Sequence, residues 1–173
     1  MAKSGKKPGC ITLIGMAGCG KSTVAKQLAE DLGWRQLDSD HLIEAIYARP
    51  LQQVTDGMSR EEFLEVEAAT ICSLDVKRMV ISTGGSVPYN KKAMEHLRSL
   101  GPVVWLDVPL EHIEERIAMN PERGLVIAPG QTIGDLLDER IPHYREGATH
   151  ICQCGAKTPL EISEWIRKKI LAG

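Results

Sequence analysis

The chain has 173 residues, of which 43% are hydrophobic and 25% are charged, and its formal net charge at pH 7 is -2. These values predict one globular domain with a sizeable core, and they exclude a broad nucleic-acid or acidic-membrane surface, which needs a concentrated excess of Lys and Arg. No apolar run reaches the ~18 residues of a membrane span, and the N-terminus lacks the apolar core of a signal peptide, so we expect a cytoplasmic protein.

The first predicted elements are a strand, a glycine-rich loop and a helix. Residues 10–14 are short, apolar and β-branched, which is typical of a buried strand, and apolar residues recur four apart after the loop. Residues 15–23 read GMAGCGKST, which fits the Walker A pattern. Such a loop turns backbone N–H groups towards a polyphosphate, and the helix N-terminus faces the same anion. We therefore predict that ATP is bound by Gly15, Gly18, Cys19, Gly20, Lys21, Ser22 and Thr23.

Two side chains of this loop have individual roles in the prediction. Lys21 reaches the β- and γ-phosphates, and the Ser22 hydroxyl completes a Mg²⁺ shell. The alternative is a glycine-rich turn that precedes a lysine by chance. The flanking strand and helix disfavour this alternative because they stand in the order that the motif requires.

A second short strand, residues 34–37, brings Asp38 and Asp40 to its carboxyl end, where open α/β sheets bind ligands. Two carboxylates beside a Mg-nucleotide are costly unless a cation or a substrate hydroxyl uses them. We predict that Asp38 holds the water shell of Mg²⁺ and that Asp40 orients or deprotonates an acceptor hydroxyl. Asp38 or Ser39 also suits the N-cap of a helix over residues 41–47, which we expect Pro50 to close.

The next predicted helix begins at Ser59, which forms a Ser-x-x-Glu capping box with Glu62. We expect Phe63 on its apolar face and Glu67 in a more exposed position. A third strand over residues 79–83 then ends in Gly84 and Gly85, where the backbone can approach a ligand closely.

The remaining chain continues the alternation of helices and strands. We expect strands at 103–108 and 149–152 and helices at 91–100, at 111–119, after Thr132 and after Thr158. Five strands alternating with helices predict an α/β fold in three layers, with a parallel sheet flanked by helices. The five histidines show no metal-ligand spacing.

Two arginines of this part are candidate site residues. Arg123 lies in a long loop with Pro and Gly that predicts a mobile lid, whose arginine meets the phosphates when the lid closes; a merely irregular connection is the alternative. Arg140 suits bidentate binding of a carboxylate, and a solvated surface charge is the alternative.

The ordered motifs resemble the shikimate kinase family, phosphate-loop proteins that are similar to nucleoside-monophosphate kinases. The resemblance implies one ATP- and Mg²⁺-dependent kinase domain over residues 1–173, with a mobile lid at about 119–131 and a substrate-binding helical region at about 40–72. It also implies a monomer with a role in amino-acid biosynthesis. The motifs that carry the resemblance are the phosphate loop, Asp38-Ser39-Asp40, Phe63-Leu64-x-x-Glu67, Thr83-Gly84-Gly85, Arg116 with Asn120 and Arg123, and Arg140-x-x-x-Tyr144.

The resemblance also implies roles for single residues. Arg116 lies against the adenine, and Arg123 is the lid arginine. Arg140 holds the substrate carboxylate. The resemblance implies that the catalytic residues are Lys21, Asp40 and Arg123. It implies that Ser22 and Asp38 bind the metal, and that the substrate pocket contains Asp40, Gly84, Gly85 and Arg140.

Three departures from the family pattern fall on the acceptor side or the lid. Leu64 replaces an arginine that clamps the carboxylate of shikimate, a charge-assisted bond worth about 1.5–3 kcal/mol. Arg60, one helical turn earlier, stands where the family usually has Glu, and it is a candidate substrate-binding replacement. Ser86 replaces the third glycine of a triplet, and Gly124 replaces a proline in the lid.

The sequence therefore predicts an ATP-dependent kinase that phosphorylates a hydroxyl of a small carboxylated metabolite. Shikimate is the family default, and homoserine or gluconate is the alternative acceptor for a pocket with fewer arginines. A non-catalytic nucleotide-binding regulator is the alternative from another class. The retention of Lys21, Asp40 and Arg123 together disfavours it, because a sensor needs neither a lid arginine nor an acceptor-side aspartate.

Overall fold

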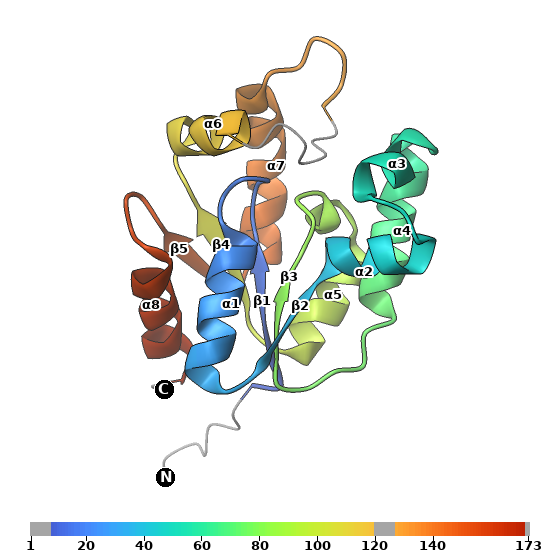
Figure 1. Cartoon of the computed structure of the whole chain (residues 1–173). Helices are drawn as coiled ribbons and strands as arrows, with labels where there is room; N and C mark the ends of the chain where they lie inside the picture. The colour runs from blue at the N-terminus through green and yellow to red at the C-terminus, as the bar shows by residue number, and fades with distance from the viewer. Residues whose placement is uncertain (1–7, 120–126, 172–173) are drawn as a thin grey trace.

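The computed structural model describes residues 8–119 and 127–171. Its centre is a parallel sheet of five strands in the order β2-β3-β1-β4-β5 (Figure 1). This arrangement confirms the predicted fold class, and each predicted strand agrees with an observed one to within one or two residues. The strands are β1 (Cys10–Ile14), β2 (Arg35–Asp38), β3 (Met79–Ser82), β4 (Val103–Asp107) and β5 (His150–Gln153).

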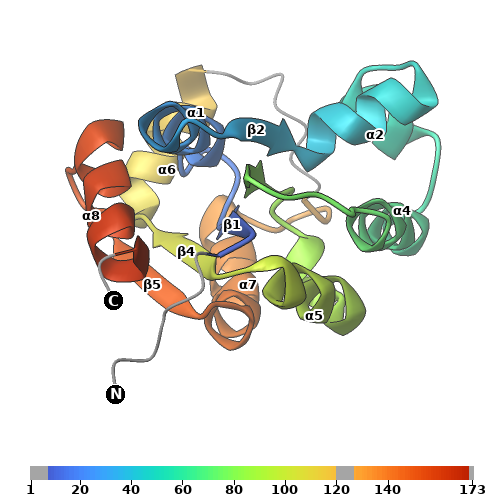
Figure 2. The ribbon, with the colours of Figure 1, turned by 90° about the horizontal axis from the view of Figure 1, so that it is seen from below.

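Helices cover both faces of the sheet. Figure 2 shows α1 (Lys21–Leu32) and α8 (Pro159–Leu171) on one side and α5 (Lys91–Leu100) and α7 (Ile133–Gly147) on the other. Successive residues of a strand point to opposite faces. Ile11 accordingly belongs to the core cluster under α1 and α8, whereas Ile14 belongs to the cluster under α5 and α7. The central strands are therefore buried on both faces, as in other parallel sheets.

A smaller helical region lies beyond the end of β2. It consists of α2 (Ser39–Tyr47), α3 (Leu51–Asp56) and α4 (Arg60–Cys72), and its own apolar cluster joins Ile43, Val54 and Phe63. The expectation that Pro50 closes the first of these helices is wrong. Helix α2 already ends before Ala48, whose φ is +51°, and Pro50 is the N-cap of α3, which the sequence analysis did not predict. Proline is also well tolerated at the start of a helix, because the backbone N–H that it lacks would have no hydrogen-bond partner within the helix at that end.

The capping predictions are confirmed. Ser59 accepts from the backbone of Glu62, whose side chain accepts in return, and the same reciprocal pair joins Thr132 and Asp135 at the start of α7. The remaining elements are the short helix η1 (Val87–Tyr89) and α6 (Leu110–Met119).

The predicted lid coincides in part with the gap in the description. Of its expected span, the structure describes residues 119 and 127–131, so Asn120, Arg123 and Gly124 lie outside the described residues. Within residues 8–119 and 127–171, no helix combines the length and the apolar character that crossing a membrane requires.

Candidate active site

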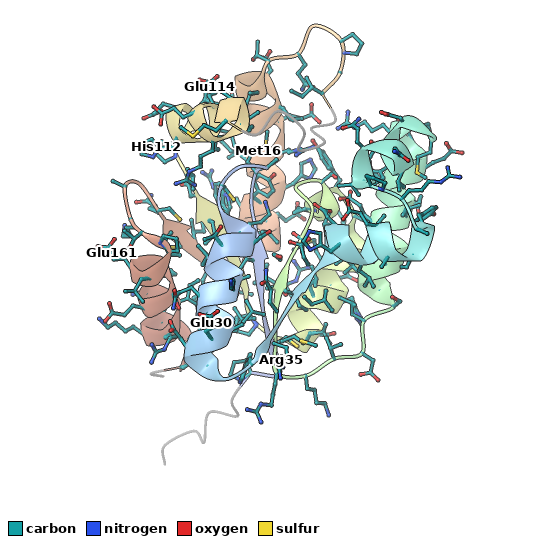
Figure 3. All side chains as sticks on the ribbon, viewed as in Figure 1. Met16, Glu30, Arg35, His112, Glu114 and Glu161 are labelled. Carbon is teal, nitrogen blue, oxygen red and sulfur yellow. The ribbon has the colours of Figure 1, made fainter. Side chains whose placement is uncertain are left out.

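The phosphate loop connects β1 to α1 at the carboxyl edge of the sheet. Figure 3 shows Met16 at this edge, beside α7, and Arg35 near the opposite edge. Gly20 is the N-cap of α1 and has a φ of +92°, a left-handed conformation that favours glycine. Lys21 is only 9% exposed, and its Nζ donates to the carbonyl oxygens of Gly15 at 2.7 Å and of Met16 at 2.8 Å. The ammonium group is thus held against the loop that is predicted to bind the phosphates.

Asp38 is joined to the phosphate loop by a hydroxyl group. Ser22 Oγ donates to Asp38 Oδ2 at 2.7 Å, and Ser82 Oγ donates to the same oxygen at 2.8 Å. Burial raises the pKa of Asp38, but these hydrogen bonds outweigh it and bring the pKa below its ordinary value. Asp38 is also the N-cap of α2, because its Oδ1 accepts from the backbone N–H of Asp40. Both predicted roles of Asp38 are compatible with this geometry.

Asp40 lies beside Asp38 and Gly84. Its Oδ1 is buried and has no hydrogen-bond partner among the described residues. Burial, and then the neighbouring charge of Asp38, raises the pKa of Asp40 to about 6. A Cβ on Gly84 would lie 2.8 Å from this Oδ1, so glycine is needed there for the backbone to approach the carboxylate.

Glu67 is a second buried carboxylate beside Gly84, and its side chain accepts a hydrogen bond from the Ser86 hydroxyl. Glu67 is only 2% exposed, so the expectation of a more exposed position is wrong. Burial raises its pKa to about 7, although the Ser86 hydrogen bond acts in the opposite direction. A signal for this burial was present in the sequence, because Phe63 precedes Glu67 by four residues and therefore shares its helix face.

Arg140 is buried as well. It is 6% exposed, so the alternative of a solvated surface charge is excluded. Its Nε has no hydrogen-bond partner, and it takes part in none of the ion pairs, within the part of the chain that the structure describes. Its Nη1 lies 3.7 Å from Met16 Sδ and 2.7 Å from where Gly85 would carry a Cβ. The guanidinium group is thus available to an anionic ligand.

A single cavity of about 370 Å³ joins these groups. The phosphate loop lines one part of it, and the helical region and the end of β3 line the rest. Most of the predicted site residues therefore lie together, and the lining adds groups that the motifs did not assign, namely His41, Glu44 and Gln52. The predicted residues in the lining are Gly18, Gly20, Lys21, Ser22, Thr23, Asp38, Asp40, Gly84, Gly85 and Arg140.

Other predicted site residues lie outside the lining. Arg60 pairs with Glu139 at 2.8 Å, and Arg116 Nη1 donates to the Gly18 carbonyl at 3.3 Å, beside the phosphate loop. Cys19 is buried within the loop, 3.7 Å from Lys21 Nζ.

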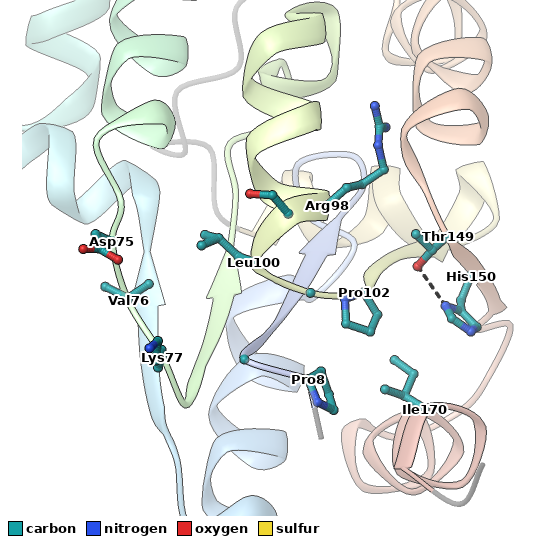
Figure 4. A pocket seen from close by; sticks show the side chains of 13 residues that line it. Pro8, Asp75, Val76, Lys77, Arg98, Leu100, Pro102, Thr149, His150 and Ile170 are labelled. Carbon is teal, nitrogen blue, oxygen red and sulfur yellow. Dashed lines mark hydrogen bonds between the residues drawn. The ribbon is translucent and has the colours of Figure 1, made fainter. Parts of the chain in front are cut away.

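A larger hollow of about 850 Å³ lies at the opposite end of the sheet (Figure 4). Lys77, Arg98 and His150 line it, and His150 Nδ1 is hydrogen-bonded to Thr149 Oγ1 at 2.8 Å. The buried side-chain atoms that lack a partner among the described residues belong to Asp40 and Arg140, which line the smaller cavity. The chemistry therefore favours the smaller cavity as the active site. No group of three or more His, Cys, Asp or Glu side chains is arranged to hold a metal in the described chain.

Comparison with known proteins identifies the family of the chain. The family model described as shikimate kinase matches residues 17–171. Shikimate kinase from Sulfurihydrogenibium sp. (strain YO3AOP1) is 35% identical over 161 residues, which are 92% of this chain and 96% of the relative. Shikimate kinase from Acinetobacter baylyi is 34% identical over 165 residues, covering 94% of this chain and 92% of the relative.

Solved structures give the same result. A structure of shikimate kinase from Acinetobacter baumannii in complex with shikimate has a TM-score of 0.86 and 31% identity, and the match covers 96% of this chain and 94% of that chain. The crystal structure of shikimate kinase from Aquifex aeolicus has a TM-score of 0.75 and 26% identity, with 94% of this chain and 96% of that chain covered.

Proposed function

The chain belongs to the shikimate kinase family and is an ATP-dependent phosphotransferase, and on this premise we propose that its acceptor is shikimate. The observation that carries the proposal is that Arg140 is buried without an ion-pair partner among the described residues. This buried guanidinium lines the same cavity as the phosphate loop, and no described ion pair neutralises it. A buried charge without a partner is costly, and the carboxylate of the acceptor supplies the partner.

Asp40 orients the acceptor hydroxyl in this proposal. Its free Oδ1 accepts the hydrogen bond of the hydroxyl and then its proton, and the raised pKa makes the carboxylate a stronger base than an ordinary Asp. The hydroxyl oxygen forms a bond to the γ-phosphorus while the bond from that phosphorus to the β,γ-bridging oxygen breaks. ADP leaves, and the phosphorylated acceptor remains.

Lys21 stabilises the charge of the transferring group. Binding of ATP would exchange its contacts with the Gly15 and Met16 carbonyls for contacts with phosphate oxygens. Ser22 Oγ and Asp38 Oδ2 are hard oxygen donors 2.7 Å apart, a donor set that fits Mg²⁺ with water and phosphate as its other ligands. When bound there, Mg²⁺ neutralises phosphate charge. We propose Arg123 as the lid arginine and Arg116, beside Gly18, as the residue against the adenine.

Arg60 is our proposal for a second carboxylate-binding residue in place of the family arginine at Leu64. It lies one helical turn from Leu64 on α4, and its current partner Glu139 precedes Arg140 directly. To touch the acceptor, Arg60 would exchange Glu139 for the acceptor carboxylate. Replacement by alanine is expected to raise the KM of the acceptor, and an unchanged KM would remove Arg60 from the site. We also expect a monomer in the cytoplasm.

The test is a steady-state comparison of shikimate, homoserine and gluconate as separate acceptors, with ADP formation as the readout. We expect the highest kcat/KM with shikimate. Arg140→Ala is expected to raise the KM of shikimate about ten- to a hundredfold, because a charge-assisted pair is lost. Arg145→Ala is the matched control, since Arg145 is exposed on the same helix. A preference for homoserine or gluconate would overturn shikimate as the acceptor.

A further inference from the structure

Glu139 is bound by donors from three separate segments. Arg60 Nη2 of α4 donates to its Oε1 at 2.8 Å, and the Tyr89 hydroxyl of η1 donates to the same oxygen. Gln131 Nε2, from the segment before α7, donates to its Oε2 at 2.9 Å. Both carboxylate oxygens of Glu139, the residue directly before Arg140 in the chain, therefore accept hydrogen bonds from other side chains. These hydrogen bonds bring the pKa of Glu139 down to about 2, so it stays ionised at neutral pH.

The ring of Tyr89 lies against two guanidinium groups. The centroid of the ring is 5.3 Å from Cζ of Arg60 and 5.8 Å from Cζ of Arg140. The ring of His143 packs against it at 4.6 Å between centroids. Because its hydroxyl is also fixed on Glu139, Tyr89 is held at both ends of its side chain. An aromatic ring at these distances attracts a cation without neutralising it.

These contacts explain how Arg140 stays oriented without an ion pair. Its described contacts are uncharged ones, namely the Met16 thioether, the Tyr89 ring and the hydroxyls of Tyr89 and Tyr144, and none of them competes strongly with a carboxylate. Glu139 is the nearest acidic residue in the sequence, and it accepts from Arg60, Tyr89 and Gln131 and forms no ion pair with Arg140 among the described residues. Arg60, whose guanidinium group also lies over the Tyr89 ring, forms an ion pair with Glu139.

We propose that Tyr89 and Glu139 form a positioning unit that keeps the Arg140 guanidinium oriented and unpaired for the carboxylate of the acceptor. Tyr89 supports Arg140 through its ring, and Glu139 fixes Tyr89 through the hydroxyl. Neither residue is part of the described lining of the cavity, whereas Arg140 is, so both act on acceptor binding through Arg140. This inference rests on the proposed function, since it needs an anionic acceptor, and it adds a specificity role for a residue that no sequence motif singled out.

The test compares Tyr89→Leu, which removes the ring and the hydroxyl, with Tyr89→Phe, which keeps the ring and removes only the donor to Glu139. We expect Tyr89→Leu to raise the KM of shikimate about three- to thirtyfold, with the KM of ATP unchanged and kcat within about twofold of the wild type. The KM of shikimate for Tyr89→Phe is expected to lie between the values for the wild type and for Tyr89→Leu. Should the leucine variant fail to fold, the phenylalanine variant carries the same test.

A second measurement separates positioning from general damage to the fold. The carboxamide of shikimate has no charge for Arg140 to bind, so its KM should be the same for the wild type and the Tyr89 variants. In an Arg140→Ala background, Tyr89→Leu should have no further effect on the KM of shikimate. An unchanged KM of shikimate in both Tyr89 variants, or an equal rise with the carboxamide, would overturn the inference.

Failure of the proposed function is distinguishable from failure of this inference. If the wild type phosphorylates homoserine or gluconate instead of shikimate, the proposed acceptor is wrong, and the Tyr89 comparison is made with that carboxylated acceptor. If the wild type phosphorylates shikimate and the Tyr89 variants match it, only the positioning unit is wrong. If the wild type phosphorylates none of the three acids, both proposals fall.

Discussion

Buried charges are concentrated at one cavity, and their partners differ in kind. Lys21, Glu67 and Arg140 are at most 9% exposed. Backbone carbonyls accept from Lys21 and a serine hydroxyl donates to Glu67, whereas the described contacts of Arg140 are a thioether and two tyrosine side chains. Buried charge without a strong partner lowers stability. We therefore propose that Arg140 serves a ligand beside the phosphate loop and not the stability of the fold.

Lys21 is the residue on which we propose that phosphoryl transfer depends most. We expect Lys21→Ala to abolish turnover, because no other described side chain donates a positive charge from within the loop. The measurement is ADP formation with saturating ATP and acceptor. Lys26→Ala is the matched control, since Lys26 is exposed on the same helix and should keep wild-type rates. Near-normal turnover in Lys21→Ala would contradict the phosphate-loop assignment.

Glu67 makes the stability of the apoprotein depend on pH. Its pKa is raised from 4.5 to about 7, so the folded state binds more protons than the unfolded state between these values. Stability should therefore fall as pH rises through this window, and Asp40, raised from 3.8 to about 6, acts in the same direction. We expect the Tm to be about 5–10 °C lower at pH 8 than at pH 5.

The variant Glu67→Gln identifies the source of this dependence. Without the ionisable group, the fall in Tm between pH 5 and pH 8 should shrink to the part that Asp40 contributes. Thermal unfolding is measured without nucleotide or Mg²⁺, so that neither ligand alters the charges. A wild-type protein that is more stable at pH 8, or a Glu67→Gln protein with the same slope, would show that the buried carboxylate is not the cause.

At the scale of elements, α4 connects the helical region to the active site. It carries Phe63 into the apolar cluster of that region, Glu67 into the cavity, and Arg60 to Glu139 on α7. Its first turn is fixed by the capping box of Ser59 and Glu62. The start of this helix therefore sets the position of three side chains with different tasks.

Ser59 gives a measurable contribution to that start. We expect Ser59→Ala to lower the free energy of unfolding by about 1 kcal/mol, or the Tm by about 2–4 °C, because the N–H of Glu62 loses its acceptor. Ser59→Asp should restore most of the loss, since aspartate caps helices as well as serine does. Equal Tm values for the alanine and aspartate variants would show that the cap contributes nothing.

The elements that the sequence predicted well are those with local signals. The phosphate loop has a fixed spacing, and the strands and capping boxes depend on residues close together in the chain. Helix α3 was missed because its six residues are too few to show a period. The burial of Arg140 and the cluster around Glu139 depend on contacts between distant residues, such as Arg60 with Glu139, 79 residues apart, which no local pattern reports.

At the scale of the molecule, the parallel sheet assembles the site. Segments at residues 15–23, 38–40 and 84–86 follow β1, β2 and β3, and these neighbouring strands all end at the same edge. Arg140 reaches that edge from α7, on the face opposite α1. The phosphate loop and the residues that we propose to bind the phosphoryl acceptor thus line one cavity, although they come from distant parts of the chain.

The most direct test of this account is one reaction mixture that contains ATP and equal concentrations of shikimate, homoserine and gluconate, with the phosphorylated products identified by mass spectrometry. Phosphorylated shikimate as the main early product is expected, because the family relation favours shikimate and we propose that Arg140 and Asp40 bind its carboxylate and its hydroxyl. Phosphorylated homoserine or gluconate as the main product, or ADP formed without any phosphorylated acid, would contradict the account.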